Sequence, residues 1–210
     1  ARLEASPGVR IAVVVPGLAG VRRAVERIFD DTLHPPGQAV GPDLKGGVFQ
    51  IAAGLPLTEV PVIAAALRIL ALGSGRISGA DAGLLLRSPF LGGAGREFGS
   101  RALLDAEMRA RGLAEASLAR MARMAEGAAP PGGSAAPWRA PELARRLRAL
   151  RRALARLRAR RGASQWSRVF SRLLRLAGWP GGREPDAAES RAIERWNDLL
   201  SDFAALEAVA

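Results

Sequence analysis

The chain has 210 residues, contains no cysteine and carries a formal net charge of +11. This length is enough for one large or two small domains, and the lack of cysteine excludes disulfides, thiolate metal sites and a cysteine nucleophile. The positive charge favours a polyanionic partner. No apolar run reaches the ~18 residues of a membrane span, so we expect no membrane contact and, since a cysteine-free chain fits a reducing compartment, a cytoplasmic location.

The first 56 residues predict a small α/β unit. Residues 11–15, "IAVVV", form a continuous apolar run that is typical of a buried parallel strand. Pro16 and Gly17 end this run, and apolar residues at helical spacing then predict a helix that ends near His34. Residues 47–54, "GVFQIAAG", indicate a second strand. The order strand, helix, strand predicts a βαβ-like unit with a small parallel sheet.

Helices dominate the remainder, so residues 57–210 predict an all-α bundle. Thr58 is expected to cap the first helix, Ser78 with Asp81 to cap the second, and Asp186 with Glu189 to cap the last. Ser164 is expected to cap the helix before it. Residues 126–140 are rich in proline and glycine and predict a mobile loop. The predicted helices cover 58–72, 78–88, 98–111, 114–125, 141–161, 164–177 and 187–208.

No catalytic residue, metal site or cofactor is predicted. The glycine cluster at 41–47, "GPDLKGG", places Lys45 before its last glycines and has no following Ser or Thr, so it does not fit a phosphate loop. His34 is the single histidine and is interpreted as a cation at a helix end. Acidic residues repeat every four positions at Glu194, Asp198 and Asp202. We interpret them as a solvated face or a salt-bridge partner for the arginine helix described next, in preference to a metal cluster.

The strongest local feature is the arginine-rich helix "PELARRLRALRRALARLRARRG" at 141–162. Its leucines recur at spacings of four and three and so form one apolar stripe that docks the helix on a neighbour. We predict that its arginines bind DNA phosphates. The alternative is a solvated arginine face that is partly paired with the acidic helix at 187–208. The candidate DNA-binding residues are Arg145, Arg148, Arg152, Arg156 and Arg160.

Several stretches together resemble the second half of UvrD/RecB-type, superfamily-one DNA helicases. In chain order they read "IAVVV", "RRAVERIF", "FQIAAGLPL", "VPVIAAALRILAL" and "ISGADAGLLLRSPFLGG", followed later by "LAGWPGG" at 176–182. The resemblance covers residues 10–93 best and corresponds to the start of domain 2A and its helical 2B insertion. It is greatest to AddB-like subunits and bacterial "probable DNA repair proteins", whose helicase core is degenerate and is usually followed by a RecB-type nuclease domain.

The resemblance implies that this part of the fold has lost its nucleotide contact. In active relatives an arginine directly follows the first strand and reaches the γ-phosphate, as an arginine finger does. Pro16 stands at that position here and offers neither a charge nor a side-chain donor.

We therefore expect a non-catalytic fragment of a bacterial DNA repair or recombination protein that scaffolds and contacts DNA during double-strand break processing. The parent protein would be a nuclease of exodeoxyribonuclease type with a degenerate helicase core. The chain begins without a methionine, which suggests a piece of a longer protein. The alternative is a helical protein-interaction module that docks a helicase or nuclease subunit without contacting DNA. Binding of RNA or of a membrane surface is weaker as a hypothesis, because no aromatic anchor lies on the apolar stripe.

Overall fold

The computed structural model describes residues 11–33, 49, 51, 56–127, 136–157 and 161–208. The chain divides into two units, residues 1–55 and residues 56–210, which are described separately. Most described residues lie in α-helices, and a two-stranded antiparallel sheet is the only sheet among them. The fold of the described residues is therefore mostly α, and the parallel sheet that the sequence predicted is not found there.

The first unit contains helix α2 (Leu18–Leu33), which follows a turn at Pro16–Gly17. Residues 11–15 do not form a strand, and Val14 is 89% exposed. A strand needs a partner for its backbone hydrogen bonds, and no described segment pairs with this run, so the prediction of a buried parallel strand is wrong. The second predicted strand, at 47–54, lies outside the described residues except for Phe49 and Ile51.

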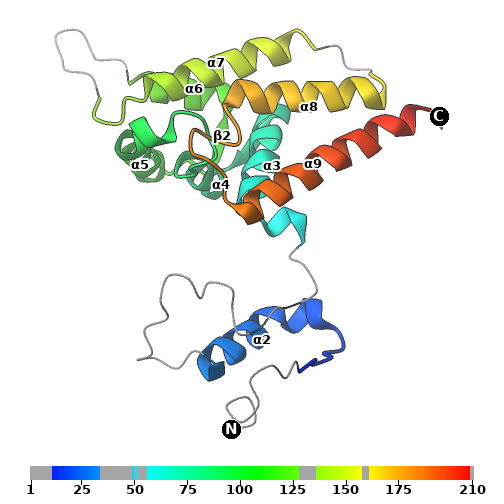
Figure 1. The fold of residues 1–210 in the computed structure, drawn as a ribbon. Helices are drawn as coiled ribbons and strands as arrows, with labels where there is room; N and C mark the ends of the chain where they lie inside the picture. The colour runs from blue at the N-terminus through cyan, green and yellow to red at the C-terminus, as the bar shows by residue number, and fades with distance from the viewer. Residues whose placement is uncertain are drawn as a thin grey trace, which may run out of the picture. The chain divides into compact units, whose positions relative to one another are not determined.

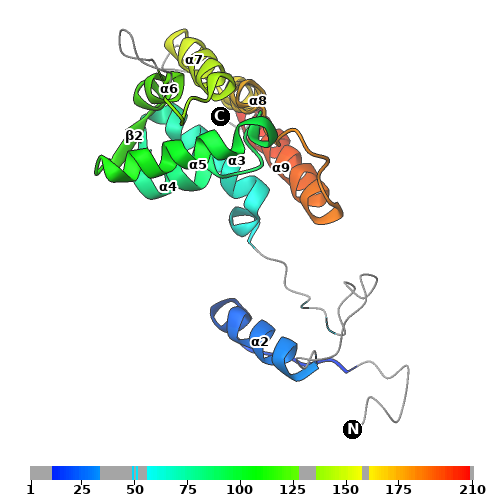
Figure 2. The ribbon, with the colours of Figure 1, turned by 90° about the vertical axis from the view of Figure 1, so that its left-hand side faces the viewer.

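The second unit is organised around helix α3 (Pro61–Ser74), which follows a short 3-10 turn, η2 (Leu57–Glu59). Pro61 occupies the first helical position, where its missing N–H costs nothing. Thr58 lies in η2 and does not cap α3, whose N-cap is Val60. Helix α3 buries one side of its surface and packs against α4, α7, α8 and α9. Figures 1 and 2 show it among the helices of the second unit.

Two short strands each lead into a helix that begins with a serine cap. Strand β1 (Arg76–Ser78) pairs antiparallel with strand β2 (Glu115–Ser117). Helix α4 (Gly79–Leu86) follows β1, and helix α6 (Leu118–Glu126) follows β2. The Ser78 hydroxyl accepts the Asp81 N–H, which confirms the predicted cap, and Ser117 makes the equivalent bond at the start of α6.

The remaining helices are α5 (Ala94–Ala110), α7 (Pro141–Ala155), α8 (Ala163–Ala177) and α9 (Ala187–Ala205), followed by the 3-10 turn η3 (Leu206–Ala208). The predicted capping box of Asp186 and Glu189 is confirmed at the start of α9. Ser164 does not cap α8. Its own N–H instead donates to the Glu207 carboxylate of η3 at 3.0 Å. In Figure 1, α7 lies along α6, and α8 lies between α7 and α9.

A buried ion pair on α5 fixes the start of α7. Arg101 is fully buried and its guanidinium is bonded to the Glu97 carboxylate at 3.1 Å and to the carbonyl of Gly92 at 2.6 Å. The same carboxylate accepts the N–H groups of Glu142 and Leu143, at 2.6 and 3.0 Å. These are first-turn donors that a helix cannot satisfy itself. The N-cap residue of α7, Ala140, has no side chain that can accept these bonds, so the Glu97 carboxylate acts as the cap.

Candidate nucleic-acid interface

The leucine stripe docks α7 as the sequence predicts. Leu143, Leu147 and Leu150 are buried, and Leu154 and Leu157 are partly buried against the same core. At 100° per residue these positions lie within one arc of the helix. The full burial of three leucines at ~1.5–3 kcal/mol each holds α7 firmly in place, and the opposite side of the helix is left to solvent.

Four of the five predicted arginines lie on that opposite side. Arg145, Arg148, Arg152 and Arg156 are all exposed, and at 100° per residue they fall within an arc of about 80°. Arg160 lies outside the described residues, and α7 itself ends at Ala155, earlier than predicted. The four exposed arginines are called the α7 arginine face below.

Few carboxylates neutralise the α7 arginine face. Arg148 is 2.7 Å from Glu126 of α6, and Arg145 is 3.7 Å from Glu142. Within the described part of the chain, Arg152 and Arg156 make no ion pair. Half of the face therefore carries uncompensated charge.

The acidic helix does not supply the missing partners. Asp198 of α9 is 3.9 Å from Arg195 of the same helix, and no ion pair among the described residues joins α9 to α7. The predicted partial pairing of the arginine face with the acidic helix is therefore not found among the described residues, whereas a solvated arginine face stays an alternative. The described chain also contains no group of three acidic or histidine side chains that could hold a metal ion.

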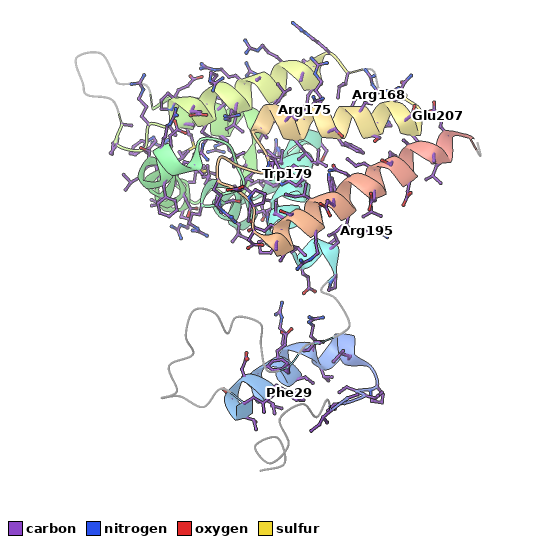
Figure 3. The ribbon with its side chains drawn as sticks, in the orientation of Figure 1. Phe29, Arg168, Arg175, Trp179, Arg195 and Glu207 are labelled. Atoms are coloured by element: carbon purple, nitrogen blue, oxygen red, sulfur yellow. The ribbon has the colours of Figure 1, made fainter. Side chains whose placement is uncertain are left out.

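A second row of arginines, which sequence reasoning missed, follows α8. Arg168, Arg172 and Arg175 are exposed and lie at spacings of four and three, on one side of the helix. Figure 3 shows Arg168 and Arg175 towards opposite ends of α8, which packs against α7. The spacing in "RVFSRLLRLAG" could have revealed this row, since Val169, Leu173 and Leu174 mark the buried side.

Arg146 differs from its neighbours because it points inward. It is bonded to Glu142 at 2.7 Å, and this bond lowers the pKa of the Glu142 carboxyl. Its guanidinium lies over Gly92 and Gly178, and a Cβ on either glycine would come within 2.5 Å of it. Arg146 is therefore a packing residue.

Two of the stretches that carry the helicase resemblance lie against each other at this point. The Gly92 N–H donates to the Ala177 carbonyl at 3.1 Å, and a Cβ on Gly178 would lie 2.7 Å from the Gly92 Cα. The Trp179 indole N–H donates to the Val62 carbonyl at 2.8 Å and ties the second stretch to α3. Close packing therefore accounts for Gly92 in "SPFLGG" and for Gly178 in "AGWPGG".

The position at which the resemblance expects an arginine lies among the described residues of the first unit. Pro16 lies in a turn and is exposed, and the segment before it does not form a strand. His34 and the glycine cluster at 41–47 lie outside the described residues.

None of the described helices combines the length and apolar character needed to cross a membrane.

Comparison with known proteins adds no relative: no family model matches the chain, and neither curated proteins nor solved structures give a significant match.

Proposed function

We propose that the second unit is a non-catalytic DNA-contacting scaffold of a bacterial DNA repair or recombination protein. Its α7 arginine face would bind the phosphates of the DNA backbone. The repair context comes from the helicase resemblance in the sequence. The DNA contact is supported by the position and pairing of the arginines.

A contrast between two helices carries the proposal. On α5, Arg101, Arg109 and Arg111 each pair with a carboxylate one turn earlier in the sequence. This i,i+4 arrangement, acid first, is the favourable one. On α7 the single acid, Glu142, pairs with Arg145 and Arg146, and the exposed arginines from Arg148 onward have no carboxylate one turn earlier.

The excess charge on α7 has an energetic consequence. Like charges four residues apart on a helix repel by ~0.2–0.5 kcal/mol per pair, and Arg152 has such neighbours at Arg148 and Arg156. An anion lying across the face would remove this repulsion. Guanidinium groups also bind phosphate oxygens in a bidentate manner. A DNA backbone supplies such anions at regular intervals.

Fluorescence anisotropy of the full chain with labelled duplex, over a salt series, tests the proposal. Replacing Arg152→Gln together with Arg156→Gln removes two contacts without breaking an internal ion pair. Because each phosphate contact contributes ~0.9 to the salt slope on duplex DNA, we expect the slope to become shallower by about two. Arg191→Gln with Arg195→Gln on α9 makes the same charge change on an acidic helix, and we expect it to leave the slope unchanged.

Two results would contradict the proposal: no duplex binding at low salt, or equal losses in the two double variants. In that case the helical interaction module becomes the better candidate. One observation favours it, which is the exposure of Phe98 and Leu103 on α5, at 61% and 48%.

A further inference from the structure

A basic hollow lies between the end of α5, the outer side of α6 and residues 136–138. Its volume is about 360 Å³, which is in the range of small-ligand sites. The side chains that give it chemical character are Arg111, Arg120, Arg123 and Trp138. No local pattern predicts this group, because the proline- and glycine-rich segment separates α6 from Trp138 in the sequence.

Helix α6 presents Arg120 and Arg123 on one side. They lie three residues apart and are exposed, whereas Met121, Ala122 and Ala125 face the core. Residues three apart on a helix are neighbours on its surface. The two guanidiniums therefore start from adjacent positions on the wall of the hollow.

The chain returns tightly to α6 and places Trp138 at the hollow. Gly127 ends α6 in the left-handed conformation, with φ of 52°, and a Cβ there would lie 3.0 Å from the Arg139 Cα. The Ala140 N–H donates to the Ala125 carbonyl at 2.8 Å and holds the returning chain against the helix. The Trp138 side chain is half-buried, with the Arg111 guanidinium 5.8 Å from its ring centroid.

The charge at the hollow is not balanced. Arg111 is paired with Glu107 at 2.6 Å, but Arg120 and Arg123 have no ion pair among the described residues. Two unpaired guanidiniums and one oriented guanidinium thus line a space that is open to solvent. This combination favours an anion with several acceptor oxygens.

The hollow adjoins the α7 arginine face. Arg123 is one turn before Glu126 on α6, and the Glu126 carboxylate is 2.7 Å from the Arg148 guanidinium. A DNA strand whose backbone contacts Arg148 is therefore within reach of Arg123. The Glu126 carboxylate, which follows Arg123 on α6, is already engaged by Arg148.

We propose that this hollow binds one nucleotide of a single DNA strand, with its phosphate on Arg120 and Arg123 and its base or sugar against Trp138. Aromatic and guanidinium groups lining a basic groove are the usual means of binding single strands without sequence preference. The proposal depends on the proposed function, because it specifies where a strand goes after it leaves the α7 arginine face.

The test uses the full chain and a labelled, 5′-phosphorylated thymidine trinucleotide, followed by anisotropy. Arg120→Gln with Arg123→Gln is expected to weaken binding at least tenfold and to make the salt slope shallower by about 0.7, the value for one phosphate on a single strand. Arg191→Gln with Arg195→Gln is the charge-matched control and is expected to bind as the unmodified chain does. Neither pair removes a buried contact, and circular dichroism checks that the variants fold.

A second measurement identifies the aromatic contact. Trinucleotide binding is expected to change the tryptophan emission of the chain, and Trp138→Phe is expected to abolish that change. Inorganic phosphate and pyrophosphate are the competing probes, and we expect them to displace the trinucleotide only at far higher concentrations. Unchanged affinity in the Arg120/Arg123 variant would overturn the proposal, and equal competition by phosphate would overturn its nucleotide part.

Failure of this proposal can be told apart from failure of the proposed function. Duplex binding is measured with the Arg152/Arg156 variant, and trinucleotide binding with the Arg120/Arg123 variant. Loss of duplex binding in the first, with no effect of the second on the trinucleotide, would leave the α7 arginine face as a DNA contact and remove the hollow. No duplex binding by the unmodified chain would remove both.

Discussion

The Glu97→Gln substitution tests whether the buried pair on α5 holds the helical unit together. Glu97 is 8% exposed and Arg101 is fully buried, so the pair is shielded from water. The substitution keeps the volume of the side chain but removes its charge. Arg101 then remains buried with two backbone carbonyls and no counter-ion, while the first turn of α7 loses a charged acceptor.

The expected loss of stability follows from this geometry. Removing one partner of a buried ion pair costs about 3–5 kcal/mol, which is a large part of the ~5–15 kcal/mol that stabilises a typical domain. For a unit of this size each kcal/mol lowers Tm by roughly 2–4 °C. We therefore expect the Tm of the Glu97→Gln chain to fall by roughly 6–20 °C.

Thermal unfolding, followed by the far-ultraviolet circular dichroism of the helices, measures this change in Tm. Glu107→Gln is the matched control, because it removes the same charge from a surface pair with Arg111 and should cost about 0–1 kcal/mol. Adding Arg101→Met to Glu97→Gln removes the unpaired charge, so the double variant should recover part of the loss. Equal small losses for Glu97→Gln and Glu107→Gln would refute the structural role of the pair.

Three further predictions concern packing and acid stability. Gly178→Ala should lower the free energy of unfolding by about 1–3 kcal/mol in urea denaturation, because its Cβ has no space and its φ is 76°, whereas Gly99→Ala, inside α5 with open space around it, should raise it by about 0.5–1 kcal/mol. Trp179→Phe should cost about 0.5–1.5 kcal/mol, since it loses the hydrogen bond to α3. Arg146 lowers the pKa of Glu142, so the ionised carboxyl stabilises the fold above its unfolded pKa of 4.5. This contribution is lost as the pH falls through the lower pKa of the folded state. Glu142→Gln should therefore make stability depend less on pH below about pH 5, and an unchanged acid profile would contradict this.

Local signals predicted the helices of the second unit well. The leucine spacing on α7 and the capping box at Asp186 depend only on residues within a few positions of each other. The same kind of signal was misleading at residues 11–15, where a short apolar β-branched run lacks a described strand partner. A run of this length cannot report whether a pairing partner exists elsewhere in the chain.

Contacts between residues far apart in the sequence determine how α7 and α8 are capped, and local patterns carry no information about them. The caps of α7 and α8 come from Glu97 and Glu207, which are 45 and 43 residues away from the N–H groups they accept. No local pattern marks such a carboxylate as a cap, and both helices begin at residues with no capping side chain. The basic hollow could not be predicted for the same reason, because Trp138 is brought to α6 by contacts such as the Ala140–Ala125 backbone hydrogen bond.

The arginines show why composition alone could not assign a role to each residue. On α7, Arg145 and Arg146 are adjacent in sequence, yet Arg145 is exposed on the arginine face and Arg146 is half-buried beside Glu142 and two glycines. On α5 and α7 the same residue type is either matched with an acid one turn earlier or left without one. A bias towards arginine in the composition explains the number of guanidiniums but not this separation. Unmatched arginines line the outer sides of α6, α7 and α8, and an external polyanion bound there would lower the electrostatic energy of the fold.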